Sequence, residues 1–142
     1  HVRKHAWVIS LAALLAVLLA LTKIIQPGFG ASGIESLARA ALPFGFATAG
    51  MAVVIIAGGI DLSVASMMAV CAVTTAVLME RMAGVPALII VLLAGAGMGA
   101  INGTLIILTK VPDIVVTLAM LFVWEGVALL ILSSISVTFT HN

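Results

Sequence analysis

Apolar runs of about twenty residues recur along this chain, and they constrain its fold more than any other feature. A helix of roughly 20 apolar residues crosses the hydrocarbon core of a bilayer. Of the 142 residues, 64% are hydrophobic and 8% are charged, whereas about 25% of the residues of ordinary soluble domains are charged. A soluble domain of this size exposes too much surface to be built with so few charges. The sequence therefore predicts an all-α, polytopic transmembrane helical bundle that is embedded in a lipid bilayer.

Breaks between the apolar runs divide the chain into about five predicted spans. Pro27 ends the first run, Glu80 and Arg81 separate the third from the fourth, and Pro112 separates the fourth from the fifth. Pro43, inside the second run, predicts a kink. The Ser- and Thr-rich residues 133–142 are predicted to lie beyond the last span. The predicted spans are about Ala6–Ile25, Leu37–Ala57, Val64–Met79, Pro86–Leu108 and Ile114–Leu132.

The break between the second and third runs is the most informative motif. Gly58 and Gly59 disrupt the helix, and Asp61 and Ser63 follow before the third run begins. Irregular backbone at membrane depth survives only where protein or a water-filled cavity covers it. We therefore expect no long exposed loop here, and we expect Asp61 or Ser63 to accept hydrogen bonds from the first N–H groups of the third helix. Both residues are also candidates for lining a permeation path.

Gly95, Gly99 and Gly103 recur at four-residue spacing on the fourth span. Small residues at this spacing form a smooth ridge that lets another helix approach closely, so helix packing is the favoured interpretation. Asn102 lies on the same span, and its amide needs partners inside the protein. A hydrogen bond between helices is a commoner role for such an amide than a contact with a solute.

Glu125 lies well inside the fifth apolar run. A charge near the middle of a bilayer costs at least about 2.5–3.5 kcal/mol, so this side chain should face the bundle interior or water. Two interpretations remain open: a residue that lines a path or is linked to proton movement, and a carboxylate that pairs with a polar group or lies nearer a membrane interface. Asp61, Ser63, Asn102 and Glu125 are together the predicted residues of a substrate path.

Several classes of chemistry lack the residues that they need. No stretch fits the G-x-x-x-x-G-K-[ST] loop that binds nucleotide phosphates, and His1, His5 and His141 lie at the chain ends, so no metal site and no other cofactor are predicted. An intramembrane aspartyl protease needs two facing aspartates; only Asp61 and Asp113 are available, and Asp113 is interpreted as a first-turn residue. The net charge of +1 gives no reason to expect nucleic acid as a partner. The chain is predicted not to be an enzyme.

Four motifs in order resemble one known family. Residues 58–66, GGIDLSVAS, resemble the GGIDLSVGS signature of bacterial ribose-type (monosaccharide) ABC transporter permeases. Residues 27–29 resemble the proline–phenylalanine step of that family, residues 99–103 resemble its G-x-x-N-G segment, and residues 110–118 resemble its VPPFIVTL segment. Autoinducer-2 importers and, more distantly, branched-chain amino-acid permeases share parts of this pattern.

Two residues depart from the family pattern. Ala65 stands where the family usually has glycine, which relaxes the close backbone approach expected there. Glu125 stands where many members carry arginine, which reverses the local charge. Members of the family are also longer than this chain, and their loop that contacts the ATPase lies in the second half. Residues 1–142 are therefore expected to form a single membrane-spanning unit, the N-terminal half of a longer permease.

The resemblance implies the membrane-spanning permease subunit of an ABC importer for a sugar or sugar-like solute in the bacterial inner membrane. It also implies an ATP-binding subunit that hydrolyses ATP, a solute-binding protein, and a second permease copy in a homodimer or pseudo-dimer. Two alternatives stay open. An ion-coupled secondary transporter would use Glu125 or Asp61 as its ion site. A non-transporting membrane scaffold would need little more than the glycine ridge of the fourth span.

Overall fold

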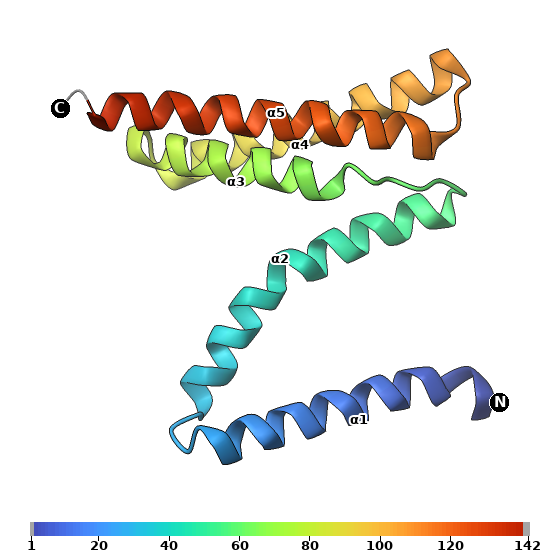
Figure 1. The fold of residues 1–142 in the computed structure, drawn as a ribbon, viewed down its shortest axis with the longest axis vertical. Helices are drawn as coiled ribbons and strands as arrows, with labels where there is room; N and C mark the ends of the chain where they lie inside the picture. Colours follow the sequence, from blue (N-terminus) through green and yellow to red (C-terminus); the bar gives the residue numbers. More distant parts are fainter. Residues whose placement is uncertain (1, 141–142) are drawn as a thin grey trace. The chain divides into compact units, whose positions relative to one another are not determined.

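The computed structural model describes the backbone of residues 2–140 and the side chains of residues 5–134. Over this part of the chain it contains α-helices and no strand (Figure 1). All of the helices contain a stretch that is long and apolar enough to cross a membrane. The predicted all-α, polytopic architecture is therefore confirmed. The helices are α1 (Val2–Ile25), α2 (Ala31–Ile56), α3 (Val64–Arg81), α4 (Gly84–Thr109) and α5 (Asp113–Thr140).

The last helix extends beyond the predicted span, although the stretch of it that is long and apolar enough to cross a membrane, Asp113–Ser134, agrees with that prediction. Helix α5 continues to Thr140, past the predicted end at Leu132. The polar side chains do not stop the helix, because a serine hydroxyl can donate to a carbonyl of the preceding turn. Ser133 donates to the Leu130 carbonyl at 2.9 Å, and Ser134 donates to the Ile131 carbonyl at 2.6 Å. Residues 141 and 142 lie outside the described residues.

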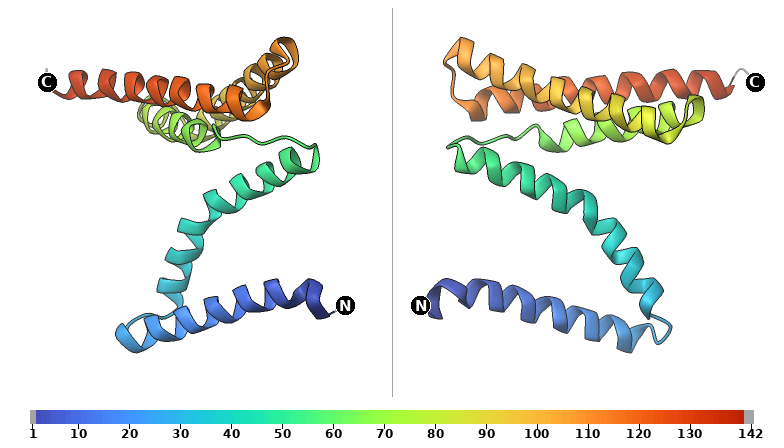
Figure 2. Two further views of the ribbon diagram at one scale, coloured as in Figure 1. Left: turned by 45° about the vertical axis from the view of Figure 1, so that its right-hand side comes forward. Right: turned by 180° about the vertical axis from the view of Figure 1, so that it is seen from behind.

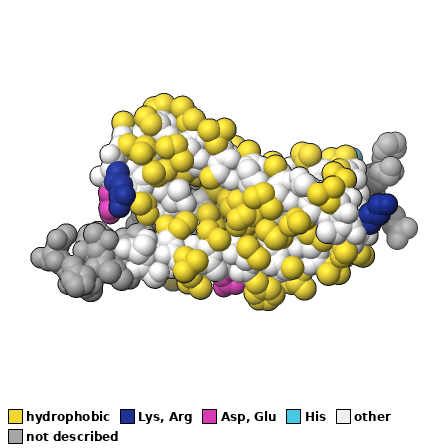
Figure 3. All heavy atoms as spheres, turned by 90° about the horizontal axis from the view of Figure 1, so that it is seen from above, with side chains coloured by type: hydrophobic (Ala, Val, Ile, Leu, Met, Phe, Trp, Pro, Cys, Tyr) yellow, Lys and Arg dark blue, Asp and Glu magenta, His cyan; other side chains and the backbone are white. Residues whose placement is uncertain are grey.

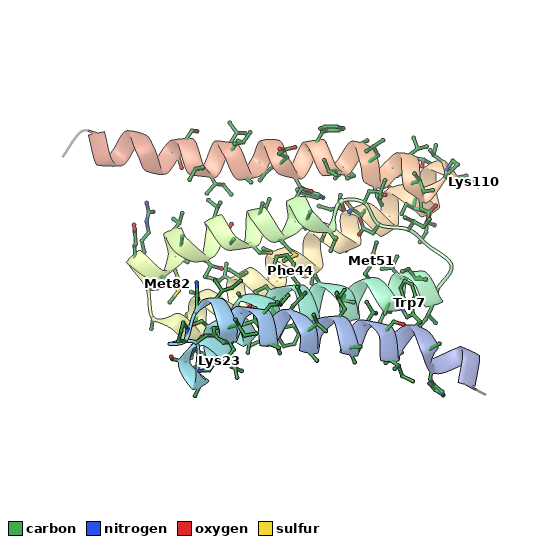
Figure 4. The ribbon with its side chains drawn as sticks, turned by 60° about the horizontal axis from the view of Figure 1, so that its bottom comes forward. Trp7, Lys23, Phe44, Met51, Met82 and Lys110 are labelled. Carbon is green, nitrogen blue, oxygen red and sulfur yellow. The ribbon has the colours of Figure 1, made fainter. Side chains whose placement is uncertain are left out.

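The chain forms two compact units, His1–Phe46 and Ala47–Asn142. In the first unit, a lysine at the end of α1 closes the turn that leads to α2. The ammonium group of Lys23 donates to the Pro27 carbonyl at 3.0 Å and to the Phe29 carbonyl at 2.6 Å. Figure 4 shows Lys23 beside this turn. A cation at this place also complements the negative end of the helix dipole of α1.

The predicted start of the second span is wrong. Helix α2 begins at Ala31, between one and two helical turns before the apolar run at Leu37. Its polar first turns are stabilised by an ion pair between Glu35 and Arg39, whose side chains approach to 2.7 Å. Residues four apart are neighbours on a helix surface, so this pair supports helical backbone where the hydrophobic pattern alone gives no signal. Pro43 lies inside α2, and the kink predicted there stays a prediction.

In the second unit, α3 packs against both α4 and α5, and α4 also contacts α5. Figures 1 and 2 show these three helices side by side from several directions. Each helix contributes one buried residue to a shared hydrophobic cluster, namely Val70, Met98 and Ala128. Partly buried side chains surround them: Met67, Cys71, Trp124, Val127 and Ile131. This packing fixes the start of α3 against its two neighbours.

The outer surface is predominantly apolar. Large hydrophobic side chains are exposed on every helix, and hydrophobic side chains are spread over the face drawn in Figure 3, where charged side chains are few. No residue in the apolar stretches of α1 and α2 is buried within the described part of the chain. Exposed apolar surface on this scale marks contact with lipid or with other protein, which agrees with spans that cross a bilayer.

Candidate functional site

The predicted break between the second and third spans is confirmed. Helix α2 ends at Ile56, α3 begins at Val64, and residues 57–63 between them are not helical. Gly58 has φ +89°, a conformation that side chains with a Cβ rarely adopt. Gly59 lies so close to its surroundings that a Cβ there would be 3.3 Å from Val54 Cγ1. The two glycines therefore permit a short, tightly held break.

The first turn of α5 holds this break in place. The carboxylate of Asp113 accepts a hydrogen bond from the backbone N–H of Ile60. Thr117, which is 1% exposed, accepts a bond from the backbone N–H of Leu62 at 3.2 Å, and its hydroxyl donates to the Asp113 carbonyl at 2.8 Å. Two N–H groups that the break removes from helical hydrogen bonding are thus satisfied by side chains of another helix. We name Asp113 and Thr117 the α5 latch.

Sequence reasoning missed the α5 latch. It interpreted Asp113 only as a first-turn residue of the last helix, and it did not single out Thr117. The bond from Ile60 to Asp113 joins residues 53 positions apart, so no local sequence pattern predicts it. The available signal was the need of the break itself: backbone N–H groups at membrane depth must find acceptors inside the protein.

Asp61 and Ser63 bond to each other at the start of α3. Asp61 Oδ1 accepts both the Ser63 N–H at 2.8 Å and the Ser63 hydroxyl at 2.6 Å. Ser63 is the N-cap residue of α3, yet its side chain makes no capping hydrogen bond. Of the two residues predicted to cap the helix, Ser63 does not do so, because its hydroxyl is engaged by neighbouring polar side chains. Asp61 accepts one N–H, that of the N-cap residue itself.

A chain of hydrogen bonds links this serine to two other helices. The indole N–H of Trp124 on α5 donates to Asn102 Oδ1 at 3.1 Å, and Asn102 Nδ2 on α4 donates to Ser63 Oγ at 2.7 Å. Asn102 is 3% exposed and Ser63 is fully buried. The expected bonding of the Asn102 amide between helices is confirmed. Trp124 was not singled out from the sequence, although an indole N–H inside a span needs an acceptor. We name Trp124, Asn102, Ser63 and Asp61 the polar chain.

A pocket of about 480 Å³ opens beside the break. Its walls come from the end of α2, the break, the middle of α4 and the first turn of α5. Asp61 and Asn102, both predicted path residues, line this pocket. Ser63 does not line it but forms hydrogen bonds with both of them. The lining residues are Val54, Ala57, Gly58, Gly59, Ile60, Asp61, Gly99, Asn102, Gly103, Ile106, Asp113 and Thr117.

The three glycines of the predicted ridge on α4 lie in two different surroundings. Gly95 faces α3, where a Cβ would lie 3.7 Å from Cys71 Sγ. Gly99 and Gly103 line the pocket, and a Cβ at either position would meet no atom within 4 Å. Within the described residues, close helix packing is therefore seen at Gly95, whereas Gly99 and Gly103 leave space in the pocket.

Glu125 does not join the other predicted path residues. It is exposed on α5 beside a shallow groove of about 270 Å³ that is lined by Ala65, Ser66, Ala69 and Leu121. No other described residue makes a hydrogen bond or an ion pair with its carboxylate. The groove leaves room beside the carboxylate because the α3 side chains that face it are small. Whether Glu125 lines a path, pairs with a polar group or lies near a membrane interface stays a prediction.

The side chains that line the pocket offer hydrogen-bond acceptors that have no partner among the described residues, but they offer no such donors. Both groups of the Asn102 amide and the hydroxyl of Thr117 are already bonded. Asp61 Oδ2 and Asp113 Oδ1 receive no hydrogen bond from any described residue, and no Lys, Arg or His is among the lining residues. The carboxylates of Asp61 and Asp113 therefore lie in one site, and Asp113 also has its predicted first-turn position on α5. Such a wall suits hydroxyl or ammonium donors and repels anions.

The fold defines a helical membrane protein, and comparison with known proteins gives its family. Residues 33–142 match the family described as branched-chain amino acid transport system / permease component, and the chain belongs to that family. It is 36% identical over 139 residues to the autoinducer 2 import system permease protein LsrD of Escherichia coli (strain K12), covering 90% of this chain and 39% of LsrD. LsrD of Shigella flexneri and of Escherichia coli O157:H7 give the same figures.

The chain thus spans about two fifths of the length of the curated relatives that it matches. No solved structure matches it. The match confirms the resemblance to ABC importer permeases that the four motifs indicate, and these relatives are described as permease proteins, not as catalytic subunits. Together with the apolar helices, it establishes a multi-pass membrane protein.

Proposed function

We propose that this chain is the membrane-spanning part of an ABC importer for a sugar or sugar-like solute, and that the pocket at the α2–α3 break belongs to the solute path. The observation that carries the proposal is the pocket itself. Irregular backbone at membrane depth is tolerated where it lines a cavity, and here the break forms one wall of a cavity that holds two carboxylates. The similarity to LsrD supports the same function.

The hydrogen-bonding capacity of the pocket favours a polyol over an amino acid. A sugar-like solute offers several hydroxyl donors, and the free oxygens of Asp61 and Asp113 are acceptors. The carboxylate of a branched-chain amino acid would instead approach two negative charges, with no lining Lys or Arg to balance it. The chemistry of the site thus supports the sugar-like solute named for LsrD over the solute in the description of the family.

In this proposal the permease performs no covalent chemistry. A separate ATP-binding subunit supplies energy, a solute-binding protein delivers the solute, and a second permease copy completes the transporter in the bacterial inner membrane. The permease exposes the pocket alternately to the two sides of the membrane. The break at Gly58 provides the place where the backbone can bend, and the α5 latch fixes the arrangement described here.

Reconstitution of the full-length permease tests this function. The permease, its ATP-binding subunit and its solute-binding protein are placed in proteoliposomes, and uptake of labelled autoinducer 2, ribose and leucine is compared. We expect uptake of a sugar-like solute that requires ATP hydrolysis, and none of leucine. A hydrolysis-deficient ATP-binding subunit is the control. Uptake that continues with this control and follows a proton or sodium gradient would overturn the proposal in favour of an ion-coupled transporter.

A further inference from the structure

We propose that Trp124 is a positioning residue for the solute pocket: its indole N–H sets the direction of the polar chain, and that direction leaves one oxygen of Asp61 available to the solute. The inference rests on the proposed function of the pocket. It concerns a residue that does not line the pocket but acts on Asp61 through Asn102 and Ser63.

The first step is the orientation of the Asn102 amide. An indole N–H donates and cannot accept, so the amide atom that faces Trp124 must be the oxygen. The amide nitrogen then faces Ser63, at 2.7 Å from its hydroxyl oxygen. Trp124 therefore decides which end of the amide meets the serine. A side chain of the same shape without the N–H would leave both orientations open.

The second step is the direction of the serine proton. Ser63 Oγ receives the amide N–H, so its single proton is free to point at Asp61 Oδ1, 2.6 Å away. If the amide turned, its oxygen would compete for that proton and Asp61 would lose a bond. Since Ser63 is fully buried and Asn102 is 3% exposed, water cannot replace the missing partner.

The third step concerns the different hydrogen-bond partners of the two oxygens of Asp61. Oδ1 accepts both bonds from Ser63, whereas Oδ2 accepts none from a described residue, and the residue lines the pocket. The polar chain thus anchors one oxygen and leaves the other for a hydroxyl donor. Donors that all point the same way polarise one another, which strengthens the bond at the carboxylate end.

An atom-scale replacement separates this role from packing, because the Trp124 ring also packs against the core of Val70, Met98 and Ala128. In the full-length permease, Trp124 is replaced by β-(3-benzothienyl)alanine, which has sulfur in place of the N–H. The control for incorporation is 5-fluorotryptophan, which keeps the donor, and the control for position is the same benzothienyl replacement at Trp7, which is 71% exposed on α1.

We expect the KM of ATP-dependent uptake to rise about five-fold when the Trp124 donor is removed, which is the effect of one lost hydrogen bond. The maximal rate should stay close to that of the parent protein, whereas the melting temperature should fall modestly because the buried Asn102 oxygen loses its donor. The 5-fluorotryptophan variant should keep both the KM and the melting temperature of the parent protein. An unchanged KM would overturn the proposal. So would a fall in melting temperature and maximal rate without a change in KM, since that result assigns the ring to packing alone.

A second readout does not depend on transport. The Trp124 indole proton is followed by NMR in the purified full-length permease. Asp61→Asn should move this resonance upfield, because the charge at the far end of the polar chain is lost, whereas Asp113→Asn, outside the chain, should not. An unmoved resonance in Asp61→Asn would overturn the positioning role. Failure of the parent protein to take up any sugar-like solute would instead reject the proposed function, and the NMR test would still stand.

Discussion

Asp113 shows how one side chain can serve two elements at once. It opens α5, where a carboxylate suits the positive end of the helix dipole, and the same carboxylate accepts the backbone N–H of Ile60 in the break. Its other oxygen receives no hydrogen bond from a described residue, and Asp113 lines the pocket. Asp113 therefore both stabilises the break and lines the proposed solute pocket. Substitutions can separate these two roles.

Asp113→Ala should destabilise the full-length permease by about 1.5–3 kcal/mol, the range for hydrogen bonds to charged groups. Asp113→Asn should retain most of that stability, because an amide oxygen still accepts the Ile60 N–H. Thermal unfolding in detergent measures both variants. If the alanine variant unfolds at the temperature of the parent protein, the bond from Ile60 does not hold the break.

Asp61 allows the complementary test. Asp61→Ala removes the acceptor of both Ser63 bonds, which should cost about 0.5–2 kcal/mol as for the loss of a helix cap, and it should also abolish uptake. Asp61→Asn should keep the Ser63 bonds but should reduce uptake strongly, because the charged oxygen that faces the solute is gone. Uptake is compared at matched expression. Complete uptake by the asparagine variant would make Asp61 a structural residue only.

At the scale of the helices, the arrangement depends on which face of α4 each glycine occupies. Gly95 approaches Cys71 on α3, while Gly99 and Gly103 open into the pocket. Small residues spaced four apart lie on one face of a straight helix. On α4, the part of this face that holds Gly99 and Gly103 lines the pocket. The same small residues therefore bring α3 close at one end and leave a cavity at the other.

Gly99→Leu should fill part of the pocket and block uptake, with little effect on the melting temperature, because a Cβ at Gly99 meets no atom within 4 Å. Gly99→Ala is the matched control and should transport nearly as well as the parent protein. Uptake and thermal stability are measured for both. A large loss of stability in the leucine variant with no change in solute KM would show that another helix, not a solute, occupies this space.

Glu125 belongs to the same scale, since it lies on α5 in a groove beside α3 and without a partner among the described residues. At membrane depth an exposed carboxylate is unfavourable, so we expect another helix or water to cover it in the assembled transporter. Glu125→Leu should then reduce transport more than expression, and Glu125→Gln should reduce it less because hydrogen bonding is kept. Full transport by the leucine variant would contradict a role in path or assembly.

For the whole molecule, apolar patterning predicts most of the architecture but little of the helix packing. The spans and the break at Gly58 follow from the length of the apolar runs and from helix-breaking residues. The bond between Asn102 and its neighbours follows from the need to satisfy an amide inside a span. The α5 latch and Trp124 do not follow, because these helices are apolar on all sides and no amphipathic face indicates which neighbour each one meets.

The central claim is that solute passes through the pocket beside the break, and thiol labelling tests it most directly. In a full-length permease from which Cys71 and any other cysteine have been removed, Ala57→Cys places a thiol in the pocket wall, and Leu130→Cys, on the exposed face of α5, is the control. A water-soluble maleimide should label position 57 at a rate that falls when transported solute is added and changes when ATP is supplied to the complete transporter. A labelling rate at position 57 that changes neither with solute nor with ATP would contradict this claim.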